Sequence, residues 1–133
     1  PVYTGPKLIA MKTKKEIESS LYCYKATIID VYDGDSVTAS VDLGFHTCME
    51  MKLRLYGIDT PEIRGKERPE GLKSRDYLRE LILNKEVYLQ SIKDKQGKYG
   101  RYLAVIFLEE KTDQMLNVNQ HLVDQKLAVE RYY

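Results

Sequence analysis

Two stretches in which apolar and polar residues alternate constrain the fold of this 133-residue chain more than any other feature. Residues 36–43 and 49–56 both repeat with a period of two, which predicts strands that bury one face. Residues 44–46 read Gly-Phe-His and supply a short turn, so the two strands are expected to pair antiparallel. The side chains predicted to face the core are Val37, Ala39, Val41, Leu43, Met49, Met51, Leu53 and Leu55.

The remaining pattern predicts a small barrel. Residues 22–31 are rich in aromatic and β-branched residues and predict a strand that an Asp-Gly-Asp turn joins to the alternating pair. A helix is predicted to begin at Pro69, because proline is tolerated in a first helical turn. The other predicted elements are strands over 87–92 and 102–108, a helix over 116–123, and a buried helical stripe of Leu78, Leu81 and Ile82. This order predicts an α+β, mainly β fold: a five-stranded OB-type β-barrel with two or three helices.

The chain is expected to divide into an N-terminal arm, residues 1–21, and one folded domain, residues 22–133. The first twenty residues show no clear period, which predicts a loose arm. Met11 has the surroundings of a translation start. The ten residues before it are therefore expected to be either foreign to the native protein or part of a form whose leader has been removed.

The net charge of +1 hides an uneven distribution. Residues 62–101 carry 11 Lys or Arg against 7 Asp or Glu, whereas residues 1–61 carry 7 against 8 and residues 102–133 carry 3 against 5. A basic middle third suits a polyanionic partner, although a solvated surface would give the same counts. No apolar run approaches the roughly 18–20 residues of a membrane span, so no membrane partner is expected.

The two cysteines and two histidines are not expected to take part in metal binding or catalysis. Cys23 and Cys48 lack metal-site spacing, which leaves a disulfide or two free, half-buried thiols, and free thiols are the preferred interpretation. His46 and His121 are interpreted as non-catalytic, because chemistry carried by carboxylates, a hard cation and arginines uses no imidazole.

Carboxylates gather at the ends of the predicted strands. Asp35 follows the glycine turn, and Asp59-Thr60-Pro61-Glu62 follows directly on the strand over 49–56. Carboxylate and carbonyl oxygens are the ligands that Ca²⁺ and Mg²⁺ prefer, and the absence of His and Cys from the cluster argues against zinc. Arg54 and Arg101 add guanidinium groups that match phosphate bidentately. Together these groups could neutralise a phosphodiester, activate a water and stabilise a leaving oxygen.

Each of these residues also has an ordinary structural explanation. The aspartates flanking Gly34 are common turn formers, and Asp59 before Thr-Pro can cap a turn. Arg54 can form a surface salt bridge on the polar face of its strand, and Arg101 can be solvated. Their joint occurrence in one order around one barrel favours the catalytic interpretation.

Three ordered motifs resemble the thermonuclease (staphylococcal nuclease-like) family. They are Ile29-Asp30-Val31-Tyr32-Asp33-Gly34-Asp35-Ser36-Val37, Leu53-Arg54-Leu55-Tyr56-Gly57-Ile58-Asp59-Thr60-Pro61-Glu62 and Lys98-Tyr99-Gly100-Arg101-Tyr102-Leu103-Ala104, with a weaker match over Val118 to Ala128. The resemblance covers about residues 22–132. The loop after Glu62 is several residues shorter than in the best-known member, and Ser36 stands where threonine is usual.

The resemblance implies a nuclease site with one Ca²⁺, for which Mg²⁺ and Mn²⁺ are alternatives. Asp35 and Asp59 would hold the ion together with the backbone carbonyl of Thr60. Asp33 would support this site from nearby without ligating the ion.

The resemblance also implies catalytic and substrate-binding roles. Glu62 would orient or deprotonate the attacking water, Arg54 would bridge the phosphate and the metal site, and Arg101 would contact the phosphate and the departing 5′ oxygen. The implied substrate-binding residues are Lys98, Tyr99 and Tyr132. Further basic side chains expected around the cleft are Arg64, Lys66, Arg68, Lys73 and Lys95.

The implied activity is hydrolysis of DNA and RNA by water attack on phosphorus, leaving 3′-phosphate ends. Single strands would be preferred, without sequence specificity, and the protein would act as a monomer. A secreted or extracellular location is favoured by the resemblance, while intracellular or phage-associated use also fits. The alternative is a catalytically weak or inactive OB-type module that binds nucleic acid or protein, although such modules usually lack one of the acids or arginines present here.

Overall fold

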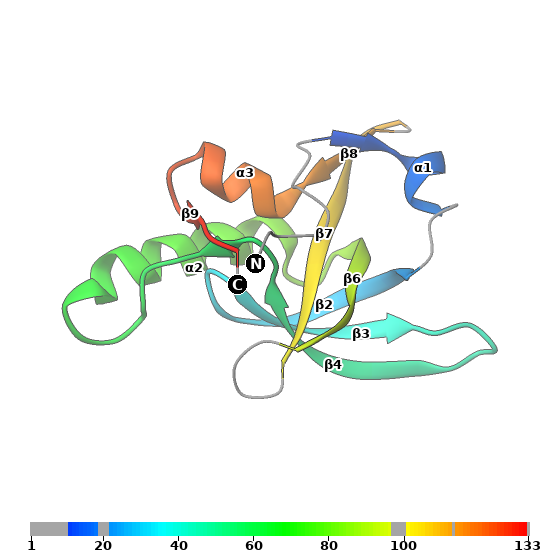
Figure 1. Ribbon diagram of the computed structural model, residues 1–133, viewed down its shortest axis with the longest axis horizontal. Coiled ribbons are helices and arrows are strands. Elements are labelled where there is room, and N and C mark those ends of the chain that lie inside the picture. Colours follow the sequence, from blue (N-terminus) through cyan, green and yellow to red (C-terminus); the bar gives the residue numbers. More distant parts are fainter. Residues whose placement is uncertain (1–10, 19–21, 97–100, 113, 133) are drawn as a thin grey trace.

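Five strands close into a β-barrel in the computed structural model, which describes residues 11–18, 22–96, 101–112 and 114–132 (Figure 1). The barrel strands are β2 (Cys23–Asp33), β3 (Ser36–Asp42), β4 (Cys48–Leu55), β6 (Glu86–Gln96) and β7 (Tyr102–Lys111). Their order is β2-β3-β4-β7-β6, and β6 pairs with β2 to close the ring. β4 and β7 run parallel, while the other neighbours are antiparallel. The predicted five-stranded OB-type barrel is confirmed.

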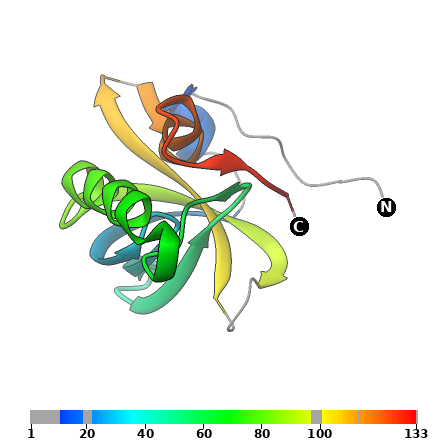
Figure 2. The ribbon, with the colours of Figure 1, turned by 90° about the vertical axis from the view of Figure 1, so that its left-hand side faces the viewer.

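Helix α2 (Arg68–Ile82) covers one side of the barrel and packs against β2. Figure 2 looks nearly along its axis and shows α3 (Val118–Asp124) above it. Leu78 and Ile82 are fully buried in the core, and Leu81 is half-buried against it, so the predicted stripe is confirmed. Pro69 lies in the first turn, as its missing N–H allows.

The last helix begins later than predicted. Residues 114–117 form a strand, β8 (Gln114–Asn117), which pairs antiparallel with β7 and includes the buried Leu116. The side chain of Asn117 accepts a hydrogen bond from the backbone N–H of Gln120 at 3.1 Å. This cap fixes the helix start at Val118, because it satisfies a backbone donor that has no partner inside the helix.

Part of the predicted loose arm is folded. β1 (Met11–Thr13) pairs antiparallel with β8, and α1 (Lys14–Glu18) follows it. Ile17 is completely buried in a second apolar cluster with Phe107 and Met115. One apolar residue is too few to give a recognisable period, which is why the sequence pattern did not show this docking. The division of the chain at residue 22 itself stays a prediction.

The hairpin formed by β3 and β4 extends past the barrel, so the predicted buried face stops short of its tip. Leu43 and Met49 are 42% and 54% exposed, and Phe45 at the turn is 99% exposed. Cys48 is exposed and Cys23 is half-buried, and within the described residues no disulfide joins them, as preferred from the sequence. No helix in the described part of the chain is long and apolar enough to cross a membrane.

Candidate active site

A cleft of about 540 Å³ opens where the β2–β3 turn, the end of β4 and the C-terminal segment meet. Among the described residues it is lined by four carboxylates, four arginines, a tyrosine and an isoleucine: Asp33, Asp35, Asp59, Glu62, Arg54, Arg64, Arg101, Arg131, Tyr32 and Ile63. Six of the residues predicted for the chemistry therefore lie together. Such a balance of charges suits an anionic ligand that must also meet a base or a cation.

Arg54 occupies the base of the cleft and is only 7% exposed. Its Nη1 donates to the carbonyl oxygens of Leu55 and Ile58, at 3.2 and 3.1 Å. Its Nη2 lies 3.3 Å from Asp59 Oδ1 and 3.4 Å from Asp35 Oδ2. The sequence allowed a surface salt bridge here, but these four acceptors instead hold the guanidinium group inside the protein.

Asp35 is buried and closely held by its surroundings. The backbone N–H of Thr60 donates to Oδ2 at 3.1 Å, and the Ser36 hydroxyl donates to Oδ1 at 3.2 Å. Burial raises the pKa of Asp35 to about 6, and the hydrogen bond and negative charge of Asp33 act in the same direction. Arg54 and the Thr60 N–H lower this pKa without cancelling the effect of burial.

Asp59 lies between two arginines, because a short strand pair brings the chain end to it. β5 (Ile58–Asp59) pairs antiparallel with β9 (Val129–Glu130), and the Arg131 N–H donates to the Gly57 carbonyl at 2.8 Å. The Arg131 side chain then lies 3.2 Å from Asp59 Oδ2, opposite the oxygen that faces Arg54. Arg131 was not predicted as a site residue, since only this tertiary pairing places it in the cleft.

Helix α2 holds the two acidic loops in place through its small residues. A Cβ at Gly71 would lie 2.2 Å from the backbone oxygen of Glu62, so the loop packs directly on the helix. A Cβ at Gly34 would lie 2.8 Å from Ser74 Cβ and 2.9 Å from a methyl carbon of Thr60. Glu62 itself is exposed at the cleft wall. These close contacts fix the backbone from which the carboxylates project.

Gly71→Ala is expected to lower the free energy of unfolding by about 1–3 kcal/mol, because the added methyl group must displace the Glu62 backbone. This range already allows for the roughly 1 kcal/mol that alanine gains in helix propensity. Urea unfolding measures the effect. Gly44→Ala is the matched control: its positive φ costs about 1–2 kcal/mol, but nothing lies within 4 Å of the new Cβ. Only Gly71→Ala should also shift the nuclear magnetic resonance signals of the backbone amides around Glu62, and unchanged signals there would contradict the bracing role.

The other predicted site residues do not all lie in the cleft. Arg101 is half-buried in the cleft, where its Nη1 donates to the Ser36 hydroxyl. Tyr132 packs edge-on against Tyr56 with ring centroids 5.5 Å apart, and it is not among the described residues that line the cleft. Its hydroxyl donates to Glu130 at 2.9 Å. Two predicted substrate contacts, Lys98 and Tyr99, lie outside the described residues.

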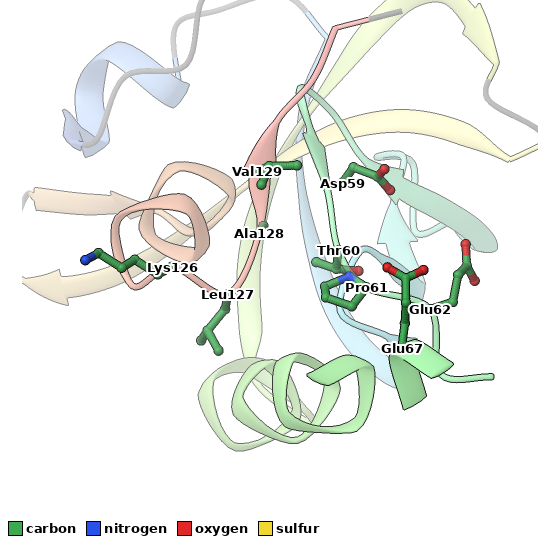
Figure 3. Close-up of a pocket in the computed structure, with 9 residues that line it drawn as sticks. All are labelled: Asp59, Thr60, Pro61, Glu62, Glu67, Lys126, Leu127, Ala128 and Val129. Atoms are coloured by element: carbon green, nitrogen blue, oxygen red, sulfur yellow. The ribbon is translucent and has the colours of Figure 1, made fainter. Parts of the chain in front are cut away.

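A smaller pocket of about 230 Å³ lies beside the loop that carries Asp59 and Glu62 (Figure 3). Its described lining is Asp59, Thr60, Pro61, Glu62, Glu67, Lys126, Leu127, Ala128 and Val129. Figure 3 shows Glu67 beside Pro61 and Glu62, and Lys126 pointing away from them. This pocket therefore shares the acidic loop with the larger cleft.

The donor set fits a hard cation in part. Two carboxylate oxygens, from Asp35 and Asp59, converge on one nitrogen of Arg54, so they lie close together at the cleft base. The Thr60 hydroxyl is buried there without a hydrogen-bond partner in the described part of the chain. Oxygen donors of this kind suit Ca²⁺, with water completing its six to eight ligands. No three His, Cys, Asp or Glu side chains within the described ranges form a ready metal cluster.

Comparisons with known proteins show which family this chain resembles. The sequence profile described as staphylococcal nuclease homologue matches residues 52–133. An uncharacterized protein of Methanocaldococcus jannaschii is 29% identical over 75% of this chain and 56% of its own length. Thermonucleases of Staphylococcus hyicus and Staphylococcus intermedius are each 28% identical, over 80% and 92% of this chain and 59% and 66% of their own lengths. The chain thus spans 56–66% of the length of these relatives.

Proposed function

Because the chain belongs to the staphylococcal nuclease family, we propose that it is a metal-dependent nuclease that hydrolyses phosphodiester bonds in DNA and RNA. The observation that carries this proposal is the cleft in which four carboxylates face four arginines. A phosphodiester is an anion that must be bound, attacked by water and separated from its leaving oxygen. Preorganised arginines and carboxylates provide these three functions.

Arg54 and Arg101 are proposed to bind the scissile phosphate. The guanidinium group of Arg54 is held by two carbonyls and two carboxylates, so it needs little reorganisation when charge develops on the phosphate. Glu62, exposed at the cleft wall, is proposed to take the proton of the attacking water. As the water oxygen bonds to phosphorus, the bond to the 5′ oxygen breaks. That oxygen accepts a hydrogen bond from Arg101 and takes a proton from solvent water to become the 5′ hydroxyl. The phosphate stays on the 3′ side.

One cation, proposed to be Ca²⁺, would be held by Asp35, Asp59 and the carbonyl of Thr60. When bound, such an ion supplies neutralising charge at the phosphate oxygens and lowers the pKa of a nearby water. Asp33 accepts a hydrogen bond from the Asp35 backbone N–H at 3.0 Å, which supports its proposed role of shaping the turn without ligating the ion. The convergence of the two carboxylates on Arg54 supports this assignment.

The substrate is proposed to be single-stranded DNA or RNA bound without sequence specificity, because arginine contacts to phosphate carry no base information. Lys98, Tyr99 and Tyr132 are retained as proposed substrate contacts from the resemblance. A monomeric state and a secreted or extracellular location are parts of the same proposal. The alternative, an inactive binding module on the same barrel, would bind nucleic acid through the same arginines and leave it intact.

The proposal is tested by digesting single-stranded DNA with Ca²⁺, with Mg²⁺ or Mn²⁺, and with EDTA. We expect cleavage with Ca²⁺, no cleavage after chelation, and products that carry 3′-phosphate ends by end-group analysis. Activity that survives EDTA, or 5′-phosphate ends, would overturn the mechanism. Binding of the DNA without cleavage under any ion would support the inactive module.

A further inference from the structure

Tyr32 and Arg64 line the cleft but have no part in the chemistry proposed above. Tyr32 lies near the end of β2, next to Asp33, and 45% of its surface is exposed. Arg64 precedes the short 3₁₀-helix η1 (Gly65–Glu67) on the opposite loop and is also exposed. Its Nη2 donates to the Tyr32 hydroxyl at 3.1 Å, so two segments 32 residues apart meet at the cleft wall.

The cleft is larger than a single phosphate group would fill. Its volume of about 540 Å³ falls within the roughly 300–1,000 Å³ of pockets that enclose small organic ligands. Asp35, Arg54 and Asp59 gather at its base, around the position of the scissile phosphate. The wall formed by Tyr32 and Arg64 therefore borders space that a neighbouring nucleotide can fill.

The hydrogen bond between Tyr32 and Arg64 contributes little to the stability of the fold. Both side chains are exposed, and a hydrogen bond between exposed groups adds little because water replaces it readily. The bond shows that the tyrosine ring and the guanidinium group lie side by side at the cleft wall. An oriented ring with a nearby guanidinium group is the arrangement that binds unpaired nucleotides, by base stacking and by phosphate contact.

We propose that Tyr32 and Arg64 form a nucleotide subsite next to the scissile phosphate, in which Tyr32 stacks on an unpaired base and Arg64 binds an adjacent phosphate. This inference rests on the proposed nuclease function for the position of the scissile phosphate. The ligand class is a single-stranded oligonucleotide, with DNA and RNA sharing the base and the phosphate that are recognised. A paired duplex does not fit, because its base faces are covered by their neighbours in the stack.

Loss of the Tyr32 ring and loss of the Arg64 charge should change oligonucleotide binding in different ways. We would titrate a short fluorescein-labelled oligodeoxythymidylate with the protein in EDTA and follow fluorescence anisotropy at several salt concentrations. Tyr32→Ala should weaken binding about tenfold with an unchanged salt slope, because it removes stacking alone. Tyr32→Phe keeps the ring and should lose much less affinity. Arg64→Gln should reduce the slope of log Kd against log salt by about one, as expected for one lost phosphate contact.

Matched controls remove a ring or a charge outside the cleft. Phe45→Ala removes the exposed ring at the hairpin tip, and Arg75→Gln removes a charge that pairs with Asp76 on α2. Both should bind as the unchanged protein does. Circular dichroism and thermal unfolding would establish that every variant is folded.

The outcomes separate this inference from the nuclease proposal. Weakened binding by the Tyr32→Ala and Arg64→Gln variants supports the subsite even if no cleavage is found under any ion. Unchanged binding and salt slope in both variants would overturn the subsite, even if the protein cleaves DNA with Ca²⁺. A protein that does not bind the oligonucleotide at all would overturn the subsite as well.

Discussion

Arg54→Lys is expected to reduce kcat on single-stranded DNA by about 10³-fold or more, the scale found when a phosphate-binding arginine is removed from a phosphoryl-transfer site. Lysine keeps the positive charge but cannot reach two carboxylates and two carbonyls while also contacting a phosphate. The effect should fall on kcat more than on KM, because the guanidinium group acts mainly on the transition state. Steady-state kinetics with Ca²⁺ measures both.

The charge-conserving variant matters because Arg54 is also structural. Arg54→Ala would leave Asp35 and Asp59 without their shared cation, at a cost of about 3–5 kcal/mol in the free energy of unfolding. Loss of activity in that variant could therefore reflect unfolding. Thermal unfolding of Arg54→Lys provides the control, and a folded Arg54→Lys protein with kcat within a few-fold of the original would refute the catalytic role.

The barrel could be predicted because its strands have recognisable local sequence patterns. The period of two over β3 and β4 requires one buried face, and the turns that join β2, β3 and β4 are short, which leaves antiparallel pairing as the simple solution. The parallel pairing of β4 with β7 leaves no such signal, because residues about 50 apart in sequence meet only when the ring closes. Ile17 and the hairpin tip were misjudged for the same reason: burial there depends on what lies opposite.

The residues that meet in the cleft could be named from their residue types, but the contacts that hold them there could not. Asp35, Arg54 and Asp59 stand beside turns and strand ends, where oxygen and guanidinium groups suggest phosphate chemistry. Arg131 reaches Asp59 only because β9 pairs with β5. The contact of Gly71 with the Glu62 backbone is likewise invisible in a helical pattern, in which a glycine merely lowers helix propensity. Tertiary pairing, absent from any local window, supplies these contacts.

Asp35→Asn is expected to stabilise the metal-free protein while abolishing cation-dependent cleavage. Burial raises the pKa of Asp35 from 3.8 to about 6. Ionising this carboxyl group therefore costs more free energy in the folded state than in the unfolded chain. At about 1.4 kcal/mol per pKa unit, this cost amounts to roughly 2–3 kcal/mol near neutral pH. Asparagine keeps the shape and cannot ionise, but it is a poor substitute for a charged cation ligand.

The dependence of this stabilisation on pH distinguishes it from a general packing effect. Since the folded pKa of Asp35 lies above the unfolded value, its protonated form stabilises the fold below about pH 4, and that contribution is lost as pH rises through 6. The gain from Asp35→Asn should thus be small near pH 4 and complete above about pH 6. Urea unfolding in EDTA across this range measures it, with Asp30→Asn, an exposed change on the same strand, as control. A gain in the free energy of unfolding that is equal at all pH values, or a loss at neutral pH, would show that burial of the Asp35 charge does not destabilise the fold.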